Sequence, residues 1–513
     1  MHSKHHTTTL TPAASPPDPD DDDDDFVSKL HSQFALYRLV LHRPVCPKVC
    51  PNQWHRVTLL LSNELGLFRK KDLEPDGFVR LRCAFLPRVG DNDGDDAYTV
   101  EARPLQDEVW ALNDVVGMKW PGFKGSAKGG LEYRIVRRKS WVAVKGAAVE
   151  AGGGCHVARE VNARTNGNRN GRVPTSTVPP PALGQRYLHI FPDPEAEHSI
   201  NVMPLVIGPL SIVADDGGDD SGGSPPAAEV PGLPTTSVPI RFWDADESLH
   251  ETYRTFPLPD FPTSTGSHRK RAGGRHLLIQ ESWDSGIPGK VWDSALVLSA
   301  FFANMIARSP KWLEGKHVVD LSAGTGFVGL YLASLATALP HPSFASATTT
   351  RKTPHITITD LSHALRLIRT NLRLNSHLIT NPTPSARVDI RRLEWGHAAD
   401  ARRLVPCDVI IASDVLYETQ HFANLVATLV TLSSIRWTRV YLGYKRRGLG
   451  RADEEKFFNM CAERFDIRVI GGESALGEGM GVGTMASVDE ENALVPELAA
   501  RTGVVLYRMI RRS

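Results

Sequence analysis

The chain has 513 residues, of which 41% are hydrophobic, and its formal net charge at pH 7 is +1. This length predicts more than one domain, and the near-zero charge excludes a general electrostatic attraction to nucleic acid. No apolar stretch approaches the roughly 20 residues of a membrane span, and the N-terminal residues are too polar for a signal peptide. The six cysteines are widely spread, which favours reduced thiols, so we expect an intracellular protein.

The first half of the chain predicts a mixed, mostly β region that matches no family we recognise. Residues 1–30 are rich in proline and aspartate and predict a disordered acidic arm. Residues 31–213 contain short apolar or alternating runs, at Phe34–Leu41, Val57–Leu61, Phe78–Phe85, Tyr98–Ala102, Tyr133–Val136, Trp141–Val144, Tyr187–Phe191 and Val202–Val213. The composition of residues 146–183 predicts a disordered insertion, and that of residues 214–238 a flexible linker.

Two clusters in this half and just after it invite a functional interpretation. His42, Cys46, Cys50 and His55 match no strong zinc spacing and are interrupted by prolines, so we predict no metal site. The basic run His268–Arg271 is more typical of a solvated loop than of a nuclear import signal.

Residues 239–513 show the pattern of an α/β domain. Trp292 precedes an apolar run that predicts a helix, and on its own it would be an ordinary core residue. His317–Leu321 then predicts a buried strand, and Ser322–Gly326 a tight turn of small residues before a helix. Such a turn lets the backbone approach a nucleotide-type cofactor, and the alternative is an ordinary strand-to-helix turn of an α/β domain.

Polar and aromatic side chains follow the next three predicted strands. Asp360 and Leu361 follow the first, Glu394 and Trp395 the second, and Ser413 with Asp414 follows the third. The carboxyl ends of such strands meet at the edge where open α/β sheets bind ligands. An acid at the position of Asp360 accepts hydrogen bonds from ribose hydroxyls.

The C-terminal part predicts a fifth strand, an amphipathic helix and a closing pair of strands. They lie at Ile435–Tyr444, Asp453–Phe465, Ile467–Ile470 and Val504–Ile510. The basic run Lys445-Arg446-Arg447, directly after the fifth strand, is a candidate for the substrate entrance.

Together these segments resemble the seven-stranded S-adenosylmethionine-dependent methyltransferases, and within them the lysine methyltransferase-like family 16, methyltransferase-like 21 type. The matching segments are Gly289–Ala295, Asp320–Gly326, Thr359–Leu361, Asn371–Asn375, Leu393–Gly396 and Asp414–Tyr417. The resemblance runs from Leu277 to Arg511. It implies a doubly wound, Rossmann-like α/β domain over residues 239–513 that uses S-adenosyl-L-methionine and methylates a protein.

The resemblance also implies the roles of single residues. The expected cofactor site consists of Trp292, Asp320, Ser322, Ala323, Gly324, Gly326, Asp360, Leu361, Glu394, Trp395 and Ser413. Trp292 would pack beside the methionine end, Asp360 would hold the ribose, and Trp395 would flank the adenine with Glu394. The family usually has glycine at position 322. If that position needs a positive φ, serine costs about 1 kcal/mol there and weakens cofactor binding.

Asp414 and Tyr417 are the expected catalytic residues. A carboxylate can hold an incoming ammonium group beside an aromatic wall, while desolvation favours the neutral amine that reacts. The alternative is that Asp414 caps the next helix and Tyr417 packs on its first turn. No Asn-Pro-Pro-Tyr-like segment is present at this strand end, which argues against nucleic-acid bases as acceptors.

Three functions stay open at this stage. The leading one is a cytoplasmic, monomeric protein-lysine methyltransferase, with a nuclear pool as a further possibility. A second is methylation of a small molecule or another side chain by the same fold. A third is a catalytically inactive binding module. Residues 31–213 would serve either substrate recruitment or stabilisation.

Overall fold

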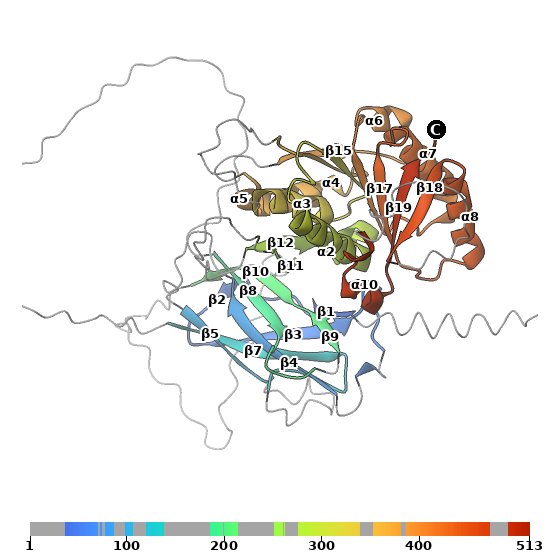
Figure 1. Cartoon of the computed structure of the whole chain (residues 1–513). Helices are drawn as coiled ribbons and strands as arrows, with labels where there is room; N and C mark the ends of the chain where they lie inside the picture. Colours follow the sequence, from blue (N-terminus) through green and yellow to red (C-terminus); the bar gives the residue numbers. More distant parts are fainter. Residues whose placement is uncertain are drawn as a thin grey trace, which may run out of the picture.

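The structure is a computed structural model in which two bodies of secondary structure pack against each other (Figure 1). It describes residues 36–69, 72–73, 77–86, 98–105, 120–137, 185–198, 200–213, 251–259, 261, 275–338, 352–380, 386–471 and 491–513. The expected acidic arm, the insertion at 146–183, the linker at 214–238, the strand at Trp141–Val144 and the basic run His268–Arg271 lie outside these ranges.

The first body consists of strands, as the sequence predicts. They are β1 (Leu36–Leu41), β2 (Lys48–Val49), β3 (Trp54–Ser62), β4 (Phe78–Phe85), β5 (Tyr98–Arg103), β6 (Gly122–Lys124), β7 (Lys128–Arg137), β8 (Gln185–Pro192), β9 (Asn201–Met203), β10 (Leu205–Ile212), β11 (Thr252–Pro257) and β12 (His276–Glu281). We call these twelve strands the N-terminal sheet. Their order is β12-β11-β10-β8-β4-β6-β7-β3-β1-β9, with β2 beside β10 and β5 beside β7.

The N-terminal sheet curls back on itself. β9 stands at one end of the strand order, yet only Pro204 separates it from β10, which lies near the other end. The concave side encloses a buried apolar cluster that includes Tyr37, Leu59, Phe123 and Tyr133. Inward-facing apolar residues therefore hold this body together, which explains the alternating pattern of its strands.

The second body is a seven-stranded sheet in the order β15-β14-β13-β16-β17-β19-β18. Its strands are β13 (His317–Leu321), β14 (His355–Asp360), β15 (Arg387–Arg392), β16 (Val409–Ser413), β17 (Arg439–Tyr444), β18 (Phe465–Ile470) and β19 (Val505–Arg511). β13 to β17 run parallel, while β19 runs antiparallel to β17 and β18. This confirms the doubly wound sheet and the closing antiparallel pair that the sequence predicts.

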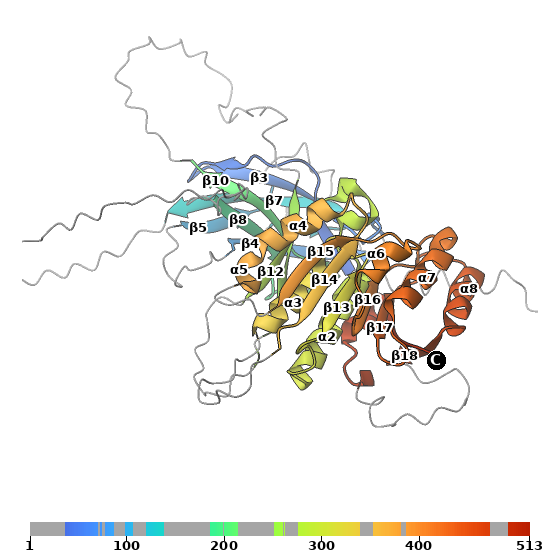
Figure 2. The ribbon, with the colours of Figure 1, turned by 90° about the horizontal axis from the view of Figure 1, so that it is seen from above.

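Helices cover both faces of the seven-stranded sheet (Figure 2). They are α2 (Asp293–Arg308), α3 (Phe327–Ala338), α4 (Leu365–Leu374), α5 (Ser376–Ile379), α6 (Ala398–Arg402), α7 (Phe422–Leu432), α8 (Arg451–Ala462) and α10 (Glu497–Thr502), with the short turns η3 (Trp283–Ser285), η4 (Ile287–Gly289) and η5 (Thr419–His421). Val318 packs with α2 and α3, whereas its neighbour Val319 packs with α7 and α8. No helix in the described ranges combines the length and apolar character of a membrane crossing.

The two bodies share a buried core. β11 and β12 belong to the N-terminal sheet, yet Phe256, Leu277 and Ile279 pack in the same cluster as α2 and α3. The rings of Phe256 and Phe327 lie 4.1 Å apart between centroids. The boundary expected at residue 239 therefore falls between β10 and β11, which are paired strands of one sheet.

Asn371 and Asn375 attach the N-terminal sheet to α4. Asn371 Oδ1 accepts a hydrogen bond from Gln280 N at 2.7 Å, and Asn375 Oδ1 accepts one from Leu278 N at 2.8 Å. Their Nδ2 atoms donate back to the carbonyl oxygens of Gln280 and Leu278. Two amide side chains four residues apart on a helix thus pair with β12 as another strand would. The Asn371–Asn375 segment has a structural role at the junction.

Candidate active site

The loops that follow β13, β14, β15 and β16 start from one edge of the seven-stranded sheet, because these strands run parallel. The strand order reverses between β13 and β16, and doubly wound sheets bind ligands outside this point. The structure therefore brings the strand-end residues predicted from the sequence to a single edge.

Asp360, at the end of β14, organises the loop after β13. Its Oδ2 accepts a hydrogen bond from Gly324 N at 2.8 Å, and its Oδ1 accepts one from Leu361 N at 2.7 Å. Burial raises the pKa of Asp360, and these two backbone donors oppose that shift. Each oxygen keeps a further lone pair, so the carboxylate can also accept hydrogen bonds from a diol.

Ser322 adopts the conformation that glycine would adopt without strain. Its φ is 56°, which confirms that this position needs a positive φ. The left-handed conformation costs about 1 kcal/mol for a residue with a Cβ. Ser322 Oγ, however, accepts a hydrogen bond from Trp395 Nε1 at 2.9 Å, and such a bond contributes about 1 kcal/mol. The serine thus gains a contact, absent for glycine, that offsets its strain.

Asp320 lies beneath this loop. It is 1% exposed, and its Oδ2 accepts a hydrogen bond from Gly329 N at 2.8 Å, while its buried Oδ1 has no hydrogen-bond partner in the described part of the chain. Burial raises the pKa of Asp320 to about 7, and the nearby Asp360 charge adds to the shift. A Cβ on Gly329 would lie 2.7 Å from Ile358 Cγ1, so glycine allows this close approach. Asp320 therefore supports the loop from below.

Asp414 is not a free carboxylate. Its Oδ1 and Oδ2 accept hydrogen bonds from Arg447 Nη1 at 2.6 Å and Nη2 at 2.9 Å. Its Oδ2 also accepts a bond from Ser294 N at 3.2 Å, at the start of α2. The side chain is 4% exposed, and its φ of 54° is a left-handed conformation that aspartate tolerates better than most residues. The strand end thus presents an ion pair.

Aromatic side chains lie beside this ion pair and the loop: Trp292 is next to Arg447, and Trp395 binds Ser322. Tyr417 is 46% exposed and its ring lies 6.1 Å from that of Trp395. Leu361 is 42% exposed. The guanidinium carbon of Arg447 lies 5.1 Å from the centroid of the Trp292 ring, and Lys290 Nζ lies 4.9 Å from it. These exposed hydrophobic surfaces are suited to contact a ligand.

The remaining expected residues differ in their surroundings. Ser413 Oγ is buried without a hydrogen-bond partner among the described residues. Glu394 is largely exposed and pairs with Arg392. A loop with positive φ at Gly324 and Gly326, an acid with lone pairs left for a diol and a buried hydroxyl without a partner among the described residues together fit a nucleoside cofactor.

A chain of buried charges connects the site to the N-terminal sheet. It runs from Arg38 on β1 through Asp293, Lys445, Glu64 and Arg447 to Asp414, with alternating sign. The N–O distances along it lie between 2.6 and 2.9 Å. Although burial would raise the pKa of Glu64, Arg447 and then Lys445 lower it well below its ordinary value. Glu64 is therefore ionised.

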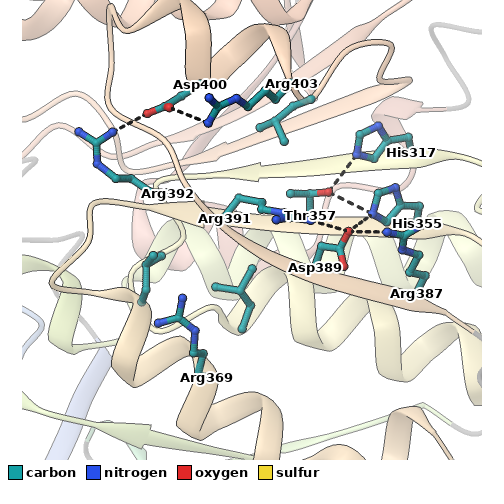
Figure 3. A pocket seen from close by; sticks show the side chains of 13 residues that line it. His317, His355, Thr357, Arg369, Arg387, Asp389, Arg391, Arg392, Asp400 and Arg403 are labelled. Carbon is teal, nitrogen blue, oxygen red and sulfur yellow. Dashed lines mark hydrogen bonds and ion pairs between the residues drawn. The ribbon is translucent and has the colours of Figure 1, made fainter. Parts of the chain in front are cut away.

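A cavity of 700 Å³ lies elsewhere, along the edge strand β15 (Figure 3). Arg387, Asp389 and His355 line it together with Arg392 and Asp400, and their charges pair with one another. None of its lining residues belongs to the expected site. Among the described residues, no group of three or more His, Cys, Asp or Glu side chains is placed to hold a metal ion.

Comparison with known proteins agrees with this geometry. The family model described as lysine methyltransferase matches residues 272–464. Protein N-lysine methyltransferase METTL21A of Danio rerio is 27% identical over 229 residues, which cover 43% of this chain and 83% of the relative. EEF1A lysine methyltransferase 3 of Mus musculus is 30% identical over 201 residues, covering 38% of this chain and 72% of the relative.

The chain belongs to the lysine methyltransferase family. It is therefore an S-adenosylmethionine-dependent methyltransferase, as the resemblance implies. The family match begins at residue 272, so it includes β12 but none of β1 to β11.

Sequence reasoning missed most of the charged network. Lys445 and Arg447 were placed near the substrate entrance only because they follow β17, and no pattern distinguished Arg447 as the partner of Asp414. Glu64 and Arg38 carried no signal, since each is a single charged residue in or beside a β strand. The unusual feature is their burial, which the sequence does not display.

Proposed function

We propose that this lysine methyltransferase family member transfers a methyl group to the ε-amine of a lysine in a protein, at the edge formed by β13 to β16. Asp360 would hold the ribose, with Ser322 to Gly326 along the cofactor and Trp395 beside the adenine. The observation that carries the proposal is the meeting of Asp360, Trp395, Tyr417 and Asp414 at one sheet edge, next to exposed hydrophobic surface.

The lysine side chain would approach between the aromatic residues and the charged end of β16. S-adenosylmethionine supplies an activated methyl group on its sulfonium, so the protein has to deliver an aligned, neutral amine. Tyr417 would contact the apolar stem of the lysine, and the carboxylate of Asp414 would attract its ammonium group. Partial desolvation would then favour release of the proton to solvent.

The relatives support a protein substrate. Those named above are described as a protein N-lysine methyltransferase and as a lysine methyltransferase of EEF1A. We infer a cytoplasmic monomer. We also infer that nucleic acid is not its substrate, and the net charge of +1 supports this second point. We infer, too, that the N-terminal sheet and residues 275–513 work as one unit, because they share a core.

The test is transfer of labelled methyl from S-adenosylmethionine into a cell extract, with protein and small-molecule fractions counted separately. We expect label in the protein fraction, and we expect Asp414→Asn to reduce it about 100-fold or more by removing the charge that attracts the amine. Asp466→Asn is the matched control, because Asp466 lies on β18 with its side chain 63% exposed. Label confined to small molecules would refute a protein substrate.

A further inference from the structure

We propose that Glu64, which lies outside the family match, is a positioning residue of the active site. It would act on the lysine substrate through Arg447 and Asp414. This inference rests on the proposed function, because it concerns the attraction of a cationic side chain. It assigns the N-terminal sheet a direct part in substrate binding, in addition to its part in the core.

Only the side chain of Arg447 lies between Glu64 and the proposed catalytic carboxylate of Asp414. Glu64 Oε1 accepts a hydrogen bond from Arg447 Nε at 2.7 Å, and its Oε2 accepts one from Arg447 Nη2 at 3.0 Å. The same guanidinium binds both oxygens of Asp414. Arg447 is thus held between two carboxylates, and the ring of Trp292 lies beside it.

Glu64 is also fixed from its other side. Its Oε1 lies 2.9 Å from Lys445 Nζ, and its Oε2 accepts a hydrogen bond from Asp293 N at 3.1 Å. The residue is 1% exposed, and it directly follows Asn63, whose Oδ1 accepts bonds from the backbone of Leu65 and Leu67. Glu64 is therefore a rigid, desolvated charge held by a structured turn after β3.

The charge of the group explains why Glu64 matters for a cationic substrate. An isolated Arg447–Asp414 pair is neutral and would attract an ammonium group weakly. Glu64, on the opposite side of the guanidinium, shares the positive charge of Arg447 with Asp414, while Lys445 offsets the charge of Glu64, so the six buried charges from Arg38 to Asp414 sum to zero. Without Glu64, Arg447 would be held by Asp414 alone, so less of the Asp414 charge would remain to attract the amine.

The chain also provides a matched control in Arg38. This residue is buried, it belongs to the N-terminal sheet, and it binds Asp293 at 2.7 Å and the carbonyl oxygen of Val291 at 3.1 Å. Among the described residues, it has no hydrogen bond or ion pair with Arg447 or Asp414. Arg38→Gln disturbs the same junction, but it removes a positive charge, whereas Glu64→Gln removes a negative one.

The experiment measures KM and kcat for the protein substrate, the affinity for S-adenosylmethionine, and the melting temperature. The variants are Glu64→Gln, Glu64→Asp, Arg38→Gln and the double variant Arg38→Gln/Glu64→Gln, all in the full chain. We expect Glu64→Gln to raise KM about tenfold, with kcat and cofactor affinity within about twofold of wild type. Glu64→Asp, which keeps the charge, should recover most of the loss.

Arg38→Gln should lower the melting temperature without raising KM. The double variant removes one charge of each sign, so it should be more stable than Glu64→Gln and should fold even if that single variant does not. Its KM should stay high, because Arg447 still lacks its second carboxylate. A double variant with wild-type KM, or an Arg38→Gln variant with the same KM increase as Glu64→Gln, would overturn the inference. If wild-type protein transfers no methyl group to protein, the proposed function fails instead.

Discussion

The N-terminal sheet and the seven-stranded sheet meet in one core, but they contribute to the site in different ways. In the seven-stranded sheet, Asp360, Trp395 and Asp414 gather because each follows a parallel strand. In the N-terminal sheet, Arg38 lies on β1 and Glu64 lies in the turn after β3, and they connect to the site through contacts with Asp293 and Arg447. The first arrangement follows from the topology of the fold, and the second follows from the packing of two bodies.

The residues that place the chain in its family and the buried charges next to the site therefore come in part from different bodies. The family match covers the strand ends that form the site, and it does not include Glu64 or Arg38. Two of the six charges in the buried network therefore come from outside the family match. Substitutions in each body can show how closely the two are joined and which properties depend on each.

The largest expected effect is at the shared core. Phe256→Ala should lower the free energy of unfolding by about 3–5 kcal/mol, because it removes a buried ring that packs against Phe327. Calorimetry should show one transition that moves to lower temperature, whereas Leu67→Ala, at a position that is 60% exposed, should change little. Two separate transitions, with only one of them shifted, would show that the sheets unfold independently.

The pH dependence of stability should depend on Asp320 in the seven-stranded sheet. Its pKa of about 7 in the folded chain exceeds the value of about 4 in an unfolded chain, so the folded state binds this proton more tightly. The resulting stabilisation is complete below about pH 4 and is lost as the pH rises towards 7. Denaturant titrations should show this loss, on the order of 2–4 kcal/mol, and Asp320→Asn should abolish that component. An unchanged profile in the variant would contradict the assignment.

Cofactor affinity should depend on the seven-stranded sheet alone. Asp360→Ala should weaken binding of S-adenosylmethionine by about 2 kcal/mol, or about 30-fold, through loss of hydrogen bonds to a charged acceptor. Isothermal titration calorimetry measures this, with Asp466→Ala as the matched substitution on β18. Equal affinities for the two variants would place the ribose elsewhere.

The smallest effect is expected at Ser322. Ser322→Gly relieves the left-handed strain but loses the hydrogen bond from Trp395, so the free energy of unfolding should change by less than about 1 kcal/mol. Cofactor affinity should also stay within a few-fold of wild type, as the same titration would show. A large gain in affinity would mean that the Trp395 bond does not offset the strain.

The parts of the site that can be predicted from the sequence are those that depend on short local segments. The strand and turn from His317 to Gly326, and the residues directly after β14, β15 and β16, follow from local patterns and from the geometry of parallel strands. The sequence also indicates that Ser322 is strained if its position needs a positive φ, and the structure has a φ of 56° there.

The remaining features depend on contacts between distant residues. Glu64 and Arg447 are separated by 383 positions, and an ion pair leaves no periodic pattern in either segment. The pairing of β11 and β12 with β10 was missed for a related reason, since nothing local to these strands specifies which sheet they join. The burial of Asp414 against Arg447 likewise could not be read from the Asp414–Tyr417 segment.

The most direct test of the account is the chemical identity of the methylated product. The full chain is incubated with S-adenosylmethionine carrying a labelled methyl group and with extract protein, and the labelled protein is hydrolysed to amino acids. The account predicts label in Nε-methylated lysine, in an amount that falls strongly in Asp414→Asn. Label in methylated histidine, or lysine labelling that is unaffected by Asp414→Asn, would contradict it.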